Sequence, residues 1–126
     1  MDINDCPKLT ELTCSQNQQL TSLRINNCPR LKEVRCVGNH QLTNFTITNC
    51  PRLEELNLSD NQLNNADFIK NLNPRSLTIL CVGNNDFPPQ DLLCFAKFIN
   101  LEKLWIGNGG TRMTYRGERK TTPIIR

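Results

Sequence analysis

Several features of enzymes and metal-binding proteins are missing from this 126-residue sequence. It has one histidine, His40, and no Cys-x-x-Cys pair, which excludes zinc ribbons and thioredoxin-like redox sites. His40 lies far in register from Cys81, so we expect no hydrogen-bonded Cys–His pair. No Ser/His/Asp set or phosphate-binding loop is visible. The sequence therefore predicts a protein that is not an enzyme and that uses no cofactor, metal or small-molecule substrate.

Long apolar runs and a leader sequence are also missing. No apolar stretch approaches the ~20 residues of a membrane span, and Met1 to Asp5 lacks the basic and apolar regions of a signal peptide. Seven cysteines, an odd number, cannot all pair within one chain, and unpaired cysteines in this number suit a reducing compartment. We therefore expect a cytoplasmic protein, or a secreted one if a signal peptide was removed from a longer precursor.

A strong charge imbalance is absent from most of the chain. The net charge is +3, from 15 basic and 12 acidic residues, and the basic excess lies in residues 109–126. The remainder is nearly neutral, which is not the composition of a dedicated nucleic-acid surface. We therefore do not expect nucleic acid as the partner.

What the sequence does contain is a repeat. Five leucines open successive copies at spacings of 22, 22, 24 and 24 residues, namely Leu9, Leu31, Leu53, Leu77 and Leu101. Apolar residues follow three and five places later, and an asparagine follows eight places later in four copies, namely Asn17, Asn39, Asn61 and Asn85. One copy cannot bury its apolar face alone, so a continuous core requires stacking of the copies.

The pattern Leu-x-x-Leu-x-(Leu or Cys)-x-x-Asn resembles that of the leucine-rich repeat family, from about Cys6 to Asn108. The resemblance implies an α/β fold, a right-handed curved solenoid of about five turns with short parallel strands on its concave face. The cysteines in the first two copies are similar to the cysteine ladder of internalin-type repeats, and equally to Asn-Cys-Pro-rich fungal repeats. An asparagine ladder would satisfy backbone groups inside the turns. We predict the solenoid at residues 1–108 and a basic, mobile tail at 109–126.

The segments between the predicted strands differ along the chain. In the first two copies the leucine spacing repeats itself, in 20–25 and 42–47, and threonines there favour extended chain. Residues 63–72 instead resemble a helix with Asn65 as its N-cap and Asn73-Pro74 as its stop, and 88–99 begins with two prolines. The sequence therefore predicts a convex side that is extended in early turns and helical in later turns.

Most of the cysteines stand in columns that follow the repeat, with Cys6, Cys28 and Cys50 in one column and Cys14 and Cys36 in another. Stacked turns place such residues in a line at ~4.8 Å per step, unlike the tetrahedral ligands of a metal site. We expect these five to be reduced and buried as small apolar core residues. Cys81 falls at an outward place, and we expect it to be the most accessible thiol.

The outward places of the five predicted strands form the candidate binding surface. The third places carry Glu11, Glu33, Glu55, Ile79 and Lys103. The fifth places carry Thr13, Arg35, Asn57, Cys81 and Trp105. The glutamates are either a solvated face or an acidic strip for a basic partner. Trp105, the only tryptophan, is either a binding hot spot or a rim residue covered by the tail or by a further turn.

These residues predict a non-catalytic protein that binds another protein or peptide through the concave strand face. Two other functions remain open: a ligand-sensing module of a larger signalling or receptor protein, and binding of nucleic acid or an anionic surface through the basic tail. Salt dependence separates the last from the others, because phosphate contacts release counterions. Lys8, Arg30 and Arg52 form a basic stripe before the strands, interpreted either as a phosphate-binding edge or as a solubilising one.

Overall fold

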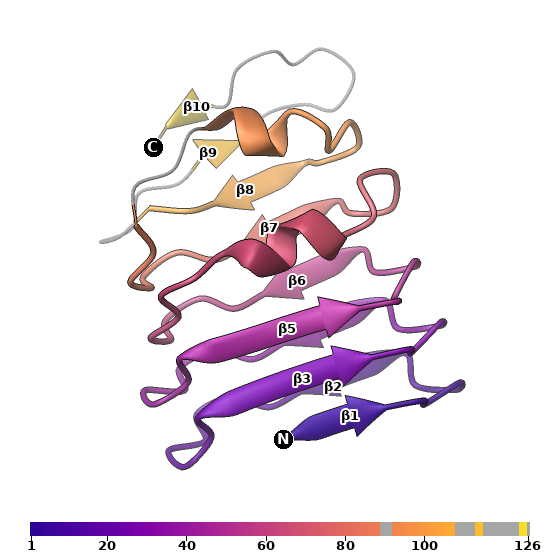
Figure 1. Cartoon of the computed structure of the whole chain (residues 1–126). Helices are drawn as coiled ribbons and strands as arrows, with labels where there is room; N and C mark the ends of the chain where they lie inside the picture. Colours follow the sequence, from indigo (N-terminus) through magenta and orange to yellow (C-terminus); the bar gives the residue numbers. More distant parts are fainter. Residues whose placement is uncertain (89–91, 108–112, 115–123, 126) are drawn as a thin grey trace.

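The structure is a computed structural model that describes residues 1–88, 92–107, 113–114 and 124–125. The chain winds into a solenoid of stacked turns whose two walls are β-sheets (Figure 1). Five parallel strands, with four complete turns between them, make up most of the longer sheet. The predicted parallel-strand solenoid is therefore confirmed, with about four turns in place of about five.

The longer sheet carries the strands that the repeat predicts. They are β2 (Glu11–Thr13), β4 (Glu33–Arg35), β6 (Glu55–Asn57), β7 (Ile79–Cys81) and β8 (Lys103–Trp105). Each strand has three residues, and its central apolar residue points into the core while its neighbours point outward. Strand partners are offset by 22 or 24 residues, as in Leu12 with Val34 and Leu56 with Leu80. The predicted register is thus confirmed residue by residue.

The opposite wall is a short parallel sheet in the early turns. It comprises β1 (Asp2–Asn4), β3 (Ser22–Asn26) and β5 (Asn44–Thr48). Leu23, Ile25, Phe45 and Ile47 from this sheet are buried against the central residues of the longer one. The extended convex side predicted for the early turns is confirmed, and β1 adds a strand that the sequence did not predict.

The helices predicted for the later turns are wrong. Among the described residues of these turns the helical segments are two short 3₁₀ ones, η1 (Asp67–Asn71) and η2 (Leu92–Phe95), so the structure does not support the α/β class with helical turns. Leu63 remains bonded to the next turn, since its carbonyl accepts from Asp86 N at 2.8 Å and its amide donates to Asn85 Oδ1 at 3.0 Å. Because Leu63 is held in this way, few residues remain before Asn73 to cross the convex side. A 3₁₀ helix suits so short a segment, since it spans more distance per residue than an α-helix.

Asn65 and Asn73, predicted to start and stop the first helix, do not have those roles in the structure. Ala66 is the N-cap of η1, and its side chain makes no capping bond. Asn65 stands one residue earlier, where its Oδ1 accepts a 2.7 Å hydrogen bond from Asp67 N. η1 ends at Asn71 with Leu72 as its C-cap, and Asn73 beyond it donates to Pro51 O and accepts from Arg75 N. Phe68 of η1 continues the core above β5, edge-to-face with Phe45 at 5.3 Å.

The asparagine ladder is present but incomplete. The Asn61 side-chain nitrogen donates to the carbonyls of Cys36 and Leu58, at 2.7 and 2.8 Å, and its oxygen accepts from Asn39 N. The Asn85 side-chain nitrogen repeats these donations one turn on, to the carbonyls of Leu58 and Val82, but its oxygen accepts from Leu63 N. Asn39 accepts from Asn17 N, but its buried Nδ2 has no hydrogen-bond partner among the described residues. Asn17 is exposed, so the ladder begins one turn later than predicted.

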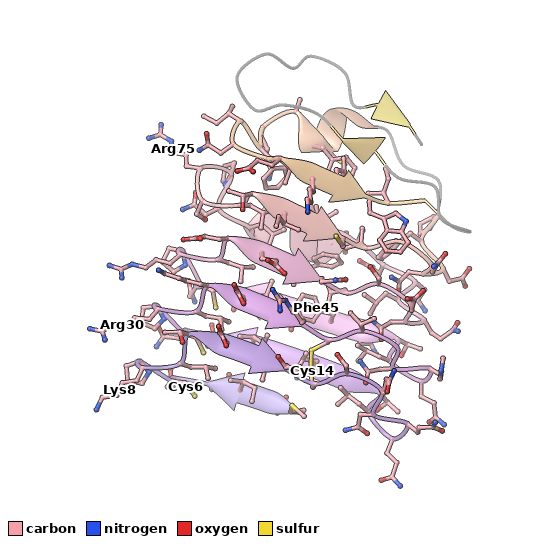
Figure 2. The ribbon with its side chains drawn as sticks, turned by 180° about the vertical axis from the view of Figure 1, so that it is seen from behind. Cys6, Lys8, Cys14, Arg30, Phe45 and Arg75 are labelled. Carbon is pink, nitrogen blue, oxygen red and sulfur yellow. A yellow bond between two sulfur atoms is a disulfide. The ribbon has the colours of Figure 1, made fainter. Side chains whose placement is uncertain are left out.

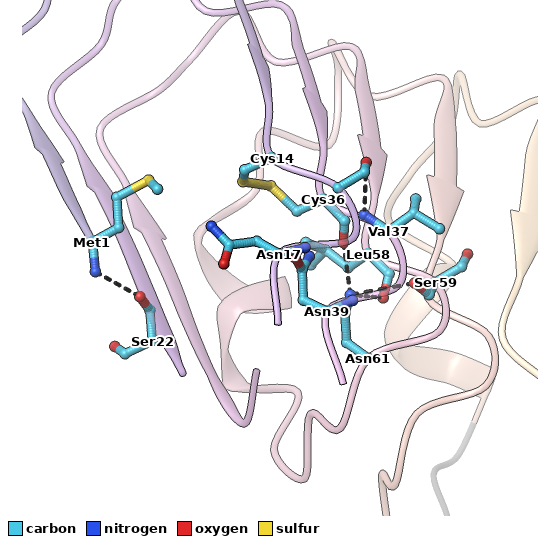
Figure 3. The surroundings of a disulfide bond; sticks show 11 residues. Met1, Cys14, Asn17, Ser22, Cys36, Val37, Asn39, Leu58, Ser59 and Asn61 are labelled. Atoms are coloured by element: carbon cyan, nitrogen blue, oxygen red, sulfur yellow. Dashed lines mark hydrogen bonds between the residues drawn. A yellow bond between two sulfur atoms is a disulfide. The ribbon is translucent and has the colours of Figure 1, made fainter. Parts of the chain in front are cut away.

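One pair of column cysteines corrects the prediction that all five are reduced. Cys14 and Cys36 form a disulfide between neighbouring turns, beside the asparagine ladder (Figure 3). The Cys6, Cys28 and Cys50 thiols each donate to the carbonyl two residues earlier. Cys28 and Cys50 are buried, as predicted, whereas Cys6 is only half-buried. Adjacent stacked turns bring two cysteines close enough either to form a disulfide or to pack as two reduced thiols. The prediction that Cys81 is the most accessible thiol is wrong, because Cys81 is half-buried on β7 while Cys94 is exposed.

At the C-terminal end, two antiparallel strands extend the longer sheet. β9 (Met113–Thr114) pairs antiparallel with β8, and β10 (Ile124–Ile125) pairs antiparallel with β9. The rest of the tail predicted at 109–126 lies outside the described residues, so its mobility stays a prediction. Across the described part of the chain, no helix has the length and apolarity that a membrane crossing requires.

Candidate functional site

The outward residues of β2, β4, β6, β7 and β8 lie on one face of the longer sheet, which we call the strand face. The structure brings all the predicted site residues together there, in two columns that run from turn to turn. Figure 2 views the molecule from this side, with the strands of the longer sheet stacked one above another. Glu11, Arg35 and Lys103 are exposed, whereas Ile79 and Trp105 are half-buried.

Arg35 organises the charges of the strand face. Its Nε donates to Glu55 Oε2 at 2.8 Å, and its Nη2 lies 3.6 Å from Glu33 Oε2. The hydrogen bond to Glu55, and then the charges of Glu55 and Glu33, raise the pKa of the Arg35 guanidinium above its ordinary value. Half of the Arg35 side chain remains exposed, compared with 18% of Glu55. One arginine therefore offsets part of the glutamate column and still has donors directed to solvent.

Trp105 does not stand free at the end of the fifth-place column. A Cβ atom added to Gly83 would lie 2.5 Å from Trp105 Nε1 and 2.6 Å from Gly107 O. The indole ring therefore rests on the bare backbone of the preceding turn, which explains why it is half-buried. Ile79 and Cys81, in the adjacent turn, are also half-buried, so this end of the strand face is less polar than the glutamate end.

A second concave feature lies at the other corner of the turns, where the sequence analysis predicted only a basic stripe. It is an open groove of about 480 Å³. We call it the asparagine groove, after lining residues that include Asn27, Asn49, Asn71, Asn73, Pro29 and Pro51. A sequence signal for it exists, because Ile-x-(Asn or Asp)-Cys-Pro recurs from Ile3, Ile25 and Ile47. The asparagine groove begins where this pattern turns from the short sheet toward the long one.

Backbone conformation explains the residue types at this corner. Asp5, Asn27 and Asn49 have φ of 54°, 57° and 54°, in the left-handed region that asparagine and aspartate tolerate best after glycine. Asn27 Nδ2 also donates to Asp5 Oδ1 at 2.7 Å, so neighbouring turns are linked through the same side chains that shape the groove.

His40 and Cys81 do not lie close to each other. His40 is exposed in the loop after Asn39, whereas Cys81 lies on β7 in the long sheet. Within the part of the chain that the structure describes, no group of three or more His, Cys, Asp or Glu side chains is placed to hold a metal ion. The strand face and the asparagine groove are therefore the surfaces from which a function can be argued.

Comparison with known proteins adds no relative: no protein-family model, no curated protein and no solved structure matches this chain.

Proposed function

We propose that this chain is a leucine-rich-repeat-type solenoid that binds a protein or peptide through its strand face and performs no catalysis. The observation that carries the proposal is the in-register alignment of outward side chains on five hydrogen-bonded strands. Such a frame presents a column of different side chains without first having to order them. Preorganisation of this kind lowers the entropic cost of association.

The chemistry of the strand face suggests an extended partner segment with two kinds of side chain. Glu11, Glu33 and Glu55 supply acceptors for a basic residue, since Arg35 offsets only part of their charge. At the other end, Ile79 and Trp105 offer half-buried apolar area, which favours an apolar or aromatic residue. A peptide that carries basic residues toward one end and apolar residues toward the other would complement both parts.

Selection of displayed random peptides on the immobilised full chain would test this proposal. We expect enriched sequences with a basic cluster separated from an apolar cluster. Trp105→Ala should weaken binding of a selected peptide by at least ~2 kcal/mol if the indole is a hot spot. Arg35→Ala should change affinity as well, since it leaves Glu33 and Glu55 without their ion-pair partner.

The matched control is Arg24→Ala, because Arg24 is an exposed arginine in the middle of β3 on the opposite wall. It should leave peptide affinity within about twofold of the original. Removal of residues 111–126 should cost less than Trp105→Ala, and mainly at low salt. Because β9 within these residues pairs with β8, circular dichroism must show that the shortened chain remains folded. If such a chain does not bind while Trp105→Ala leaves binding unaffected, the strand-face proposal is wrong and binding through the basic tail replaces it.

A further inference from the structure

A row of cations runs along the edge of the solenoid next to the asparagine groove. The structure adds Arg75 to the three predicted from the sequence, and we call the set the basic edge: Lys8, Arg30, Arg52 and Arg75. Each directly follows a proline, at the corner where the chain turns toward the long sheet. Figure 2 shows Lys8, Arg30 and Arg75 along one edge, with their side chains directed away from the molecule.

The charges of the basic edge are not neutralised by the protein itself. All four side chains are exposed, and none forms an ion pair with a carboxylate among the described residues. The neighbouring corner column carries Lys32, Glu54 and Glu102, a net charge of −1 that is too small to offset four cations. At ~4.8 Å per turn the row is about 15 Å long, which suits a linear polyanion better than a single small anion.

The asparagine groove supplies neutral hydrogen-bonding groups beside these charges. Pro29 and Pro51 line the groove and are followed directly by Arg30 and Arg52, so the basic edge borders it. Asn27 and Asn49 use their Nδ2 atoms within the protein, but their Oδ1 atoms accept no bond from a described residue. Asn71 is exposed and its side-chain amide makes no hydrogen bond with the described residues. The groove thus offers both acceptors and donors.

We propose that the asparagine groove and the basic edge bind a linear sulfated polysaccharide. Hydroxyl groups of the sugars match the amides of the groove, and sulfate groups match the planar donors of the arginines. Single-stranded nucleic acid fits less well, because its binding sites stack bases on aromatic rings and no described aromatic residue lines the groove. The Cys14–Cys36 disulfide agrees with an oxidising compartment, where the secreted alternative would place the chain.

Binding of a heparin-derived hexasaccharide to the full chain, measured by calorimetry at two salt concentrations, tests the proposal. Arg30→Gln with Arg52→Gln should weaken binding on the order of tenfold or more, and should reduce its salt dependence. The matched control, Arg24→Gln with Lys97→Gln, removes the same charge from exposed positions outside the groove, the basic edge and the strand face, and should weaken binding less than about threefold. Removal of the sulfates from the probe should weaken binding on the order of tenfold or more.

Two further measurements separate a built site from simple charge attraction. Asn71→Ala should weaken hexasaccharide binding by about threefold, whereas Asn64→Ala, an exposed asparagine outside the groove lining, should not. A single-stranded oligonucleotide of similar charge should bind on the order of tenfold more weakly than the hexasaccharide. Equal losses in the two double variants, no measurable binding of the hexasaccharide, or tighter binding of the oligonucleotide would each overturn the proposal.

Discussion

Leu56→Ala tests most directly whether the stacked turns share one core. Leu56 is the central residue of β6 and is fully buried, with Val34 on one side and Leu80 on the other. Removing its terminal carbons loses roughly 2 kcal/mol of transfer free energy at ~0.8 kcal/mol per methylene group. The cavity left between turns adds to this, so we expect a total loss of about 3–4 kcal/mol, within the ~2–5 kcal/mol found for buried leucines. That is a large share of the ~5–15 kcal/mol typical of a domain.

Urea denaturation followed by far-ultraviolet circular dichroism and by Trp105 fluorescence measures this loss. Trp105 lies in β8, two strands beyond Leu56, so coincident curves would show that the turns unfold together. Leu12→Ala is the matched control, because Leu12 is the equivalent residue of β2 at the edge of the sheet and is only half-buried. It should cost less than about half as much. A Leu12→Ala loss equal to or larger than that of Leu56→Ala would refute the reasoning.

Three further outcomes follow from individual contacts. Asn61→Ala should lower stability by about 3 kcal/mol, because it leaves the Cys36 carbonyl without a donor and the buried Asn39 amide without an acceptor; a urea midpoint unchanged within error would contradict this. Gly83→Ala should cost about 1–3 kcal/mol and shift Trp105 emission, since the new methyl group collides with the indole; an unaltered spectrum would contradict it. Burial raises the pKa of the Cys50 thiol above its ordinary value of 9.0, so thiol labelling followed by mass spectrometry should find exposed Cys94 modified first and Cys50 only after unfolding; early labelling of Cys50 would contradict it.

The strand register was predictable because backbone hydrogen bonding fixes it. Parallel strands in successive turns must pair at the repeat offset, so the spacing from Leu31 to Leu53 also sets which outward residues become neighbours. This is why the Glu33 and Arg35 columns of the candidate site appear where the sequence placed them. The contact of Trp105 with Gly83 was not predictable in this way, because it depends on the rotamer of one side chain rather than on the register.

The course of the chain on the convex side was less predictable. Residues 63–72 have the composition of a helix, but the hydrogen bonds of Leu63 to the next turn shorten the segment that can coil. The hydrogen bonds between turns override the helical propensity of this segment, and they exist only once the turns are stacked. The disulfide was also not predictable from the sequence. The Cα atoms of Cys14 and Cys36 are 4.7 Å apart. That distance allows a disulfide or two packed thiols, and spacing along the chain does not distinguish them.

The leucine pattern predicts neither strand β1 nor the asparagine groove, because both lie outside the leucine-bearing strands. Aligning the Ile-x-(Asn or Asp)-Cys-Pro segments instead places Ile3 beside Ile25, which is the pairing that the structure shows. The same alignment puts Asp5, Asn27 and Asn49 in one column of left-handed residues. A column of this kind marks a fixed corner, since few residue types adopt that conformation without strain.

The asparagine groove also depends on the change of period along the chain. Its Asn49 and Pro51 come from a turn with an extended convex segment, whereas Asn71 and Asn73 come from the first turn with a 3₁₀ segment. The longer sheet continues past this junction without a break, because the added residues are accommodated on the convex side and leave strand pairing unchanged. A longer period therefore alters the edge of the solenoid while the strand face keeps its register. Two surfaces of one repeat can in this way diverge in chemistry, and substitutions at Asn71 and Trp105 should affect separate ligands.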